Sequence, residues 1–132
     1  QVIEDVGLSD FIQKSPGGIN TELLPGGKNI PGSIQSKILV ARAVIAFPTL
    51  LAMEDPLRSV NQRDRLRLIK YLTDPKQPWT LVCTTEDPDL AANCDRIVVL
   101  KEGEIVFDGT FEEVRKTTHF ERVFRAGSPF ND

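Results

Sequence analysis

The chain has 132 residues, 40% of them hydrophobic, and a formal net charge of −3 at pH 7. That hydrophobic content is enough for a packed core and excludes compositional disorder, while the acidic balance argues against the basic face that nucleic-acid binding usually needs. The longest apolar stretch, residues 38–53, is interrupted by Arg42 and Pro48. It falls short of the roughly 20 residues that a membrane span requires, and the acidic N-terminus is unlike a signal peptide.

The two cysteines, Cys83 and Cys94, show no metal-ligand spacing. We therefore interpret them as reduced thiols of a cytosolic protein, rather than as a disulfide or a reactive thiol.

The N-terminal third predicts helices joined by a long loop. Apolar spacing over residues 2–13 indicates one or two short helices, punctuated by Gly7. A loop rich in glycine and proline follows over residues 15–33, and long ordered loops are often functional. Residues 35–46 then predict a helix that ends before Pro48.

The middle of the chain alternates strands and helices. Residues 49–53 predict a short strand buried on both faces, as parallel strands often are. Strand 79–84 is expected to be buried as well, and residues 90–94 predict a short helix. An amphipathic helix is predicted between the two strands, over residues 63–72, with these candidates for the core: Leu66, Ile69, Tyr71 and Leu72.

The last third predicts a hairpin and a helix. Strand 96–101 pairs with residues 104–107 through a Glu102-Gly103 turn. A helix over residues 111–125 begins at Thr110, with Glu113 completing a capping box. Strands that alternate with helices and end in a hairpin predict an α/β fold with a largely parallel sheet.

Three segments in this order resemble the ATPase domain of ATP-binding cassette (ABC) transporters of the exporter type: VGLSDFIQKSPGGINTEL, KILVARAVIAFPTLLAMEDP and CDRIVVLKEGEIVFDGTFEEV. The resemblance covers about residues 2–126 and implies the C-terminal part of a P-loop NTPase-like (RecA-like) domain. On this basis residues 1–46 are expected to form the helical subdomain and signature helix, residues 47–126 the Walker B side of the α/β core, and residues 127–132 a tail.

The resemblance gives a role to the two acids that end strand 49–53. In the family an Asp holds Mg²⁺ there, and the next residue, a Glu, is the general base for the attacking water. Here Glu54 takes the metal position and Asp55 the base position, so the order is reversed. Each side chain differs by one methylene from the family pattern, which alters its reach toward metal or water. The alternative is that both acids are an ordinary solvated strand end.

The signature of the family, Leu-Ser-Gly-Gly-Gln, binds the phosphate held by a partner subunit at a helix N-terminus. Residues 30–34 align with it here as Ile-Pro-Gly-Ser-Ile. Pro31 offers neither a hydroxyl nor an N–H, whereas Gly32 and the Ser33 backbone remain. The alternative is an ordinary helix start with Ser33 as its N-cap.

Three further aligned positions depart from the family. Asn61 stands where an Asp contacts the opposite subunit, and it keeps hydrogen-bonding ability without the charge. Glu86 stands where a histidine touches the terminal phosphate, and an ionised carboxylate cannot donate a hydrogen bond to phosphate. Pro25 replaces a glutamate that senses the membrane domain in exporters, and the lone histidine, His119, is predicted to lie on the surface.

No G-x-x-x-x-G-K-[ST] phosphate loop occurs in the chain, and the family has that loop upstream of the region matched here. We therefore expect a fragment of a degenerate domain that does not hydrolyse ATP by itself, with a bare sheet edge open to pairing between copies. The resemblance implies ATP and Mg²⁺ as cofactors of the intact domain, a second nucleotide-binding domain and a transporter membrane domain as partners, and a location on the cytoplasmic side of a membrane. Two alternatives are a non-catalytic docking or regulatory module, and an unrelated α/β enzyme with a metal held by Glu54, Asp55 and Glu86.

Overall fold

The structure is a computed structural model that describes residues 1–125. Two compact units divide the chain, residues 1–83 and the segment from Thr84 onward. The tail predicted over residues 127–132 lies outside the described residues.

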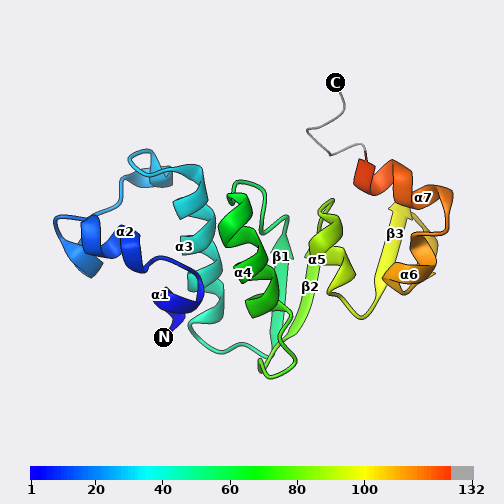
Figure 1. The fold of residues 1–132 in the computed structure, drawn as a ribbon, viewed down its shortest axis with the longest axis horizontal. Coiled ribbons are helices and arrows are strands. Elements are labelled where there is room, and N and C mark those ends of the chain that lie inside the picture. Colours follow the sequence, from blue (N-terminus) through cyan, green and yellow to red (C-terminus); the bar gives the residue numbers. More distant parts are fainter. Residues whose placement is uncertain (126–132) are drawn as a thin grey trace. The chain divides into compact units, whose positions relative to one another are not determined.

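The first unit opens with two short helices, α1 (Val2–Asp5) and α2 (Ser9–Lys14). Gly7 lies between them with a φ of 75°, a left-handed conformation that glycine adopts without strain. The prediction of two short helices around Gly7 is thus confirmed. The following loop contains two single 3₁₀ turns, η1 (Gly18–Asn20) and η2 (Pro25–Gly27) (Figure 1).

Helix α3 spans Gly32–Val44, so it begins before the predicted Gln35. Pro31 is its N-cap, and its carbonyl accepts hydrogen bonds from the backbone N–H of Ile34 and of Gln35. The interpretation of Ser33 as the N-cap is therefore wrong, because the fixed φ of Pro31 starts the helix two positions earlier. Phe47 ends the segment in a left-handed conformation directly before Pro48.

Strand β1 (Leu50–Glu54), helix α4 (Gln62–Leu72) and strand β2 (Thr80–Thr84) form a strand–helix–strand unit. The two strands form one sheet, and the Thr80 N–H donates to the Thr49 carbonyl at 2.8 Å. Because this bond joins the beginnings of the two strands, they run in the same direction, as a helical crossover requires.

The strands are covered on one face only, so the prediction of strands buried on both faces is wrong for the described residues. Leu51 is 3% exposed, whereas its neighbour Leu50 is 60% exposed and Val82 on β2 is 57% exposed. Side chains alternate across a strand, so one set faces the helices of the unit and the other does not. The core of this unit contains Val6, Val40, Val44, Leu68 and Leu72.

Helix α4 buries a set of side chains that differs in part from the predicted set. Leu66 is 57% exposed, and Leu68 is fully buried in its place, while Ile69 and Leu72 are buried as predicted. The Trp79 indole N–H donates to the Leu72 carbonyl at 3.0 Å and fastens the end of α4 to the start of β2.

The second unit holds α5 (Pro88–Ala92) and a hairpin of β3 (Ile97–Lys101) and β4 (Glu104–Gly109). The strands pair antiparallel, and the turn residues Glu102 and Gly103 have φ values of 52° and 82°. The predicted hairpin is confirmed. Among residues 1–125 there are thus two two-stranded sheets, one parallel and one antiparallel, where a largely parallel sheet was predicted.

The predicted helix over residues 111–125 is broken into α6 (Phe111–Val114), α7 (Thr118–Phe120) and a π-helical turn, η3 (Glu121–Arg125). Thr117 separates α6 from α7 with an extended backbone, and its hydroxyl donates to the Val114 carbonyl at 2.7 Å. That local bond replaces a helical one, a competition typical of threonine. The predicted capping box of Thr110 and Glu113 is present.

Candidate functional site

The candidate residues of the first unit meet where α3 begins and β1 ends. A Cβ placed on Gly32 would lie 3.3 Å from the Ser59 Cβ, so the start of α3 packs against the turn after β1. A side chain at residue 32 would be tighter than an ordinary contact, so Ser59 would have to shift slightly to admit it. Pro31 and Gly32 are exposed at this junction and Ser33 is half-buried.

Glu54 and Asp55, the two acids at the end of β1, differ in backbone conformation and in their contacts. Glu54 is the last residue of β1 and is exposed. Asp55 has a φ of 41°, a left-handed conformation that Asp tolerates better than most residues. Its carboxylate lies 3.6 Å from the Arg58 guanidinium Nε, three residues on, and the buried Leu57 anchors the turn between them.

A hollow of about 250 Å³ lies between α3 and β1, beside these acids. Apolar side chains make most of its wall, and Glu54, Asp55 and Pro56 close one end. Two adjacent carboxylates suit a hard cation such as Mg²⁺. Within residues 1–125, however, no three His, Cys, Asp or Glu side chains are grouped closely enough to hold a metal ion, which gives the alternative carboxylate-cluster enzyme no support.

Asn61 is engaged with its own helix. Its Oδ1 accepts from the Asp64 backbone N–H at 3.0 Å and caps α4, while its Nδ2 donates to Asp64 Oδ2 at 3.0 Å. These two bonds fix the orientation of the Asn61 amide at the exposed end of the turn.

A charge network behind this turn was missed by the sequence reasoning. Asp64 also forms an ion pair with Lys37 on α3, and the Lys37 Nζ donates to the Gly7 carbonyl at 3.1 Å. Burial tends to raise the pKa of Asp64, but hydrogen bonds from Lys37 and Asn61, together with the charges of Lys37 and Arg63, lower it below its ordinary value. The sequence could have suggested this pair, because Lys37 lies on one predicted helix and Asp64 lies in the first turn of the next.

Gln35 braces the loop that precedes α3. Its Nε2 donates to the carbonyls of Gly27 and Ile30, at 2.9 and 3.1 Å. Gly27 has a φ of 66°, and a Cβ there would meet the Gln35 side chain at 3.0 Å. The loop that leads into residues 30–34 is therefore held by the helix it introduces.

Glu86 belongs to the second unit, where it is exposed between β2 and the Asp87 cap of α5. Asp87 accepts from the backbone N–H of Asp89 and of Leu90 and so caps α5. A larger hollow in this unit, of about 460 Å³, is lined by Arg115, Lys116 and their neighbours on α7, and by none of the candidate residues.

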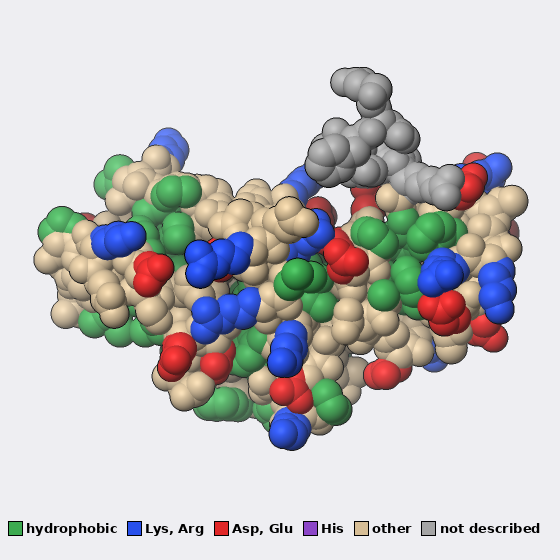
Figure 2. All heavy atoms as spheres, viewed as in Figure 1, with side chains coloured by type: hydrophobic (Ala, Val, Ile, Leu, Met, Phe, Trp, Pro, Cys, Tyr) green, Lys and Arg blue, Asp and Glu red, His purple; other side chains and the backbone are tan. Residues whose placement is uncertain are grey.

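Acidic and basic side chains are interspersed on the face drawn in Figure 2. None of the helices within residues 1–125 is both long and apolar enough to cross a membrane. Within the described residues, Cys83 and Cys94 form no disulfide.

Several known proteins are similar to this chain, although no family model matches it. The chain is 30% identical over 121 residues to the mating factor M secretion protein mam1 of Schizosaccharomyces pombe, and 30% identical over 106 residues to the ATP-dependent lipid A-core flippase of Desulfotalea psychrophila. These alignments cover 91% and 80% of the chain.

The chain is a homologue of the ABC transporters. It spans 9% of the length of mam1 and 18% of that of the flippase, so it corresponds to a small part of each. A solved bacterial Atm1-family ABC exporter with ATP bound matches the fold, with a TM-score of 0.84 at 18% sequence identity. That match covers 95% of this chain and 22% of the exporter chain, and it shows that the mixed α/β fold is one found in an ABC exporter.

Proposed function

We propose that the chain is the C-terminal part of a degenerate nucleotide-binding domain of an ABC exporter, in which ATP binding rather than fast hydrolysis is coupled to transport. The contact between Gly32 and Ser59 carries this proposal. It brings the signature-like start of α3 against the turn that follows the two acids at the end of β1. One domain would thereby present both the helix start and the turn to a nucleotide that a second domain holds.

The residues would divide the work as follows. Glu54 would hold Mg²⁺ and Asp55 would orient the attacking water, with Glu86 at the position facing the terminal phosphate. Gly32, Ser33 and Asn61 would face the nucleotide of the partner domain, next to Pro31, which adds no donor there. ATP and Mg²⁺ would be the cofactors, and a second nucleotide-binding domain and a membrane domain the partners.

Slow turnover follows from the geometry of the acids. Asp55 is shorter than Glu and its carboxylate already lies beside Arg58, so it would reach an attacking water poorly. Glu86 would repel the phosphate where a donor is needed. A missing positioned donor typically costs about 10²–10³ in rate, and a weak base adds to this.

Turnover and nucleotide affinity of the full-length protein test the proposal. We expect Mg²⁺-dependent ATP binding in the micromolar range, typical of nucleotide sites, with slow hydrolysis that Asp55→Ala changes little. Asp74→Ala, on the loop after α4, is the matched control for loss of an aspartate. Hydrolysis at a rate typical of enzymes in general, roughly 1–10³ per second, and abolished by Asp55→Ala alone, would show that the altered site is fully catalytic.

A second function is favoured by Pro31 and Glu86, which both remove groups that a phosphate needs. In this case the domain would be a docking or regulatory module, a pseudo-ATPase whose fold is kept for its surface. The same titration separates the two functions, because a docking module would show no Mg²⁺-dependent ATP binding.

A further inference from the structure

Lys37 is the one charged side chain that is buried among residues 1–124, with 5% of its surface exposed. An ammonium group removed from water is costly unless charged or polar partners surround it. The Nζ of Lys37 has two such partners, the Asp64 carboxylate and the Gly7 carbonyl. Their identity and position are therefore tightly constrained.

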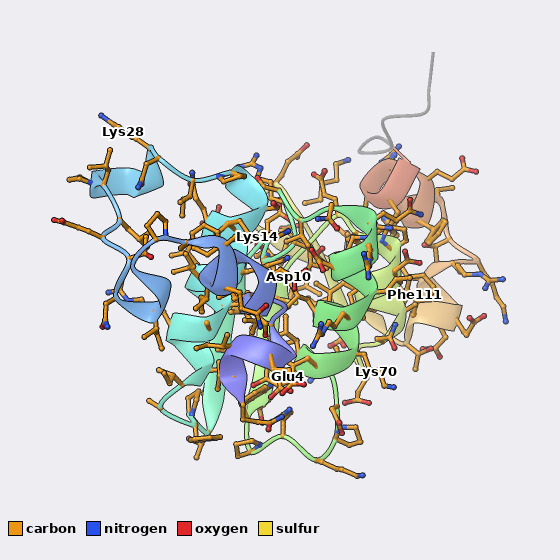
Figure 3. All side chains as sticks on the ribbon, turned by 60° about the vertical axis from the view of Figure 1, so that its left-hand side comes forward. Glu4, Asp10, Lys14, Lys28, Lys70 and Phe111 are labelled. Carbon is orange, nitrogen blue, oxygen red and sulfur yellow. The ribbon has the colours of Figure 1, made fainter. Side chains whose placement is uncertain are left out.

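The partners come from three separate segments. Gly7 lies in the turn between α1 and α2, Lys37 on α3, and Asp64 in the first turn of α4. A second bond runs between the same segments, since the Arg67 guanidinium on α4 donates to the Glu4 carbonyl on α1. Figure 3 shows α1, with Glu4, lying across α3 and α4.

The backbone at Gly7 fits this role. A Cβ there would lie 3.5 Å from Asp64 Oδ1 and 3.7 Å from Lys37 Nζ, and the φ of 75° disfavours any other residue. The turn thus brings its carbonyl directly against the ion pair. At the other end of the network, Asp64 holds the Asn61 amide through the 3.0 Å bond from Nδ2.

We propose that the Lys37–Asp64 pair is a positioning device that makes the α1–α2 turn, helix α3 and the Asn61 turn move as one body. Lys37 is a positioning residue, because it acts on the exposed Asn61 through Asp64. The use of the device rests on the proposed function, in which Asn61 and the start of α3 face the nucleotide of a second domain. A displacement of α1 and α2 would then reach that nucleotide directly.

The first test needs no nucleotide. In the full-length protein, Lys37→Met keeps the aliphatic stem and removes the charge, and Lys70→Met removes a charge from an exposed site on α4, the helix that carries Asp64. Hydrogen exchange is measured at the Gly7 and Leu8 amides and at the Asp64 and Arg65 amides. We expect Lys37→Met to speed exchange about tenfold at both ends of the network. Lys70→Met should change neither end.

The proposal would be overturned if Lys37→Met sped exchange at only one end of the network, or if Lys70→Met sped it by the same factor. Should Lys37→Met unfold the whole first unit, which would appear as exchange at buried Leu68, the conservative Lys37→Arg takes its place. Arg keeps the charge and the donors but changes their geometry, so the same two ends should exchange faster by a smaller factor.

The second test separates positioning from a merely structural role. We expect Lys37→Met to weaken ATP-dependent pairing of two domains several-fold, with the ATP affinity of a single domain unchanged, and Lys37→Arg to restore part of the pairing. If Lys37→Met sped exchange at both ends but left the association of the two domains unchanged, the Lys37–Asp64 pair would have a structural role only, and the positioning role would be refuted. If the wild-type protein binds no ATP, the proposed function fails, while the exchange measurement still decides the coupling.

Discussion

At the scale of single residues, a buried charge is paired within the fold, whereas two positions that we propose to face a phosphate carry no side-chain hydrogen-bond donor. Lys37 and Asp64 are paired in the interior of the first unit. Pro31 and Glu86, in contrast, are exposed and remove hydrogen-bond donors relative to the family pattern.

The lowered pKa of Asp64 predicts a pH dependence. A carboxylate whose pKa is depressed by folding stabilises the folded state above its unfolded pKa, near 3.9, and this contribution is lost as the pH falls through the lower folded value. Asp64→Asn should therefore be less stable than wild type at pH 7, and the difference should shrink below about pH 4. Thermal unfolding of both proteins between pH 2.5 and 7 checks this.

Asp10→Asn, on the exposed face of α2, is the control and should track wild type across the range. A difference between wild type and Asp64→Asn that grows on acidification would contradict the prediction, because it would assign the stabilising form of Asp64 to its protonated state.

At the scale of elements, short-range chemistry decides the second unit. The capping box at Thr110 and the Glu102-Gly103 turn join residues close in sequence, and the bidentate pair of Arg96 with Asp108 joins diagonal positions across the hairpin. Arg96 also lowers the pKa of Asp108, first by its hydrogen bond and then by its charge. Such features can be predicted from short stretches of sequence.

The turn of the hairpin gives the prediction at this scale. Both central residues have positive φ, a geometry in which Asn-Gly is preferred and Glu is strained. Glu102→Asn should stabilise the second unit by about 0.5 kcal/mol. Denaturant unfolding, followed by a probe in this unit, measures the change.

Glu104→Asn makes the same substitution two positions on, inside β4, and should be destabilising because Asn is disfavoured in strands. If both variants were destabilising to the same extent, turn geometry would not be the source of the effect.

The sequence predicted what depends on neighbours and missed what depends on distant contacts. Gly7, the hairpin turn and the Thr110 cap were predicted because each is a local conformational preference. The face of α4, with Leu68 rather than Leu66 inside, depends on where α3 packs, and the Lys37–Asp64 pair joins residues from different helices. The resemblance assigned roles to residues 30–34, 54, 55 and 61, and those roles stay predictions, whereas the left-handed Asp55 and its contact with Arg58 were not predicted.

At the scale of the whole molecule, the described residues form two units with separate cores. Val40 and Val44 lie in the first core, while Ala91, Val99 and Val114 belong to the second. A core made of side chains from one unit ties the stability of that unit to its own packing.

Matched truncations test this division. Val40→Ala and Val114→Ala each remove two methyl groups from a site at most 1% exposed, at a cost of about 2 kcal/mol. Hydrogen exchange should locate the effect of Val40→Ala in residues 1–83 and that of Val114→Ala beyond residue 84. Equal loss of protection in both units from either variant would mean that they unfold as one cooperative body.

The burial of Lys37 also has a practical consequence for chemical labelling. A primary amine sequestered from water is slow to meet acylating reagents, so Lys37 should be spared while exposed lysines such as Lys14, Lys28 and Lys70 react. Its modification would therefore record the moments when the first unit opens. The protein carries its own reporter of that opening, readable by mass spectrometry without any introduced dye.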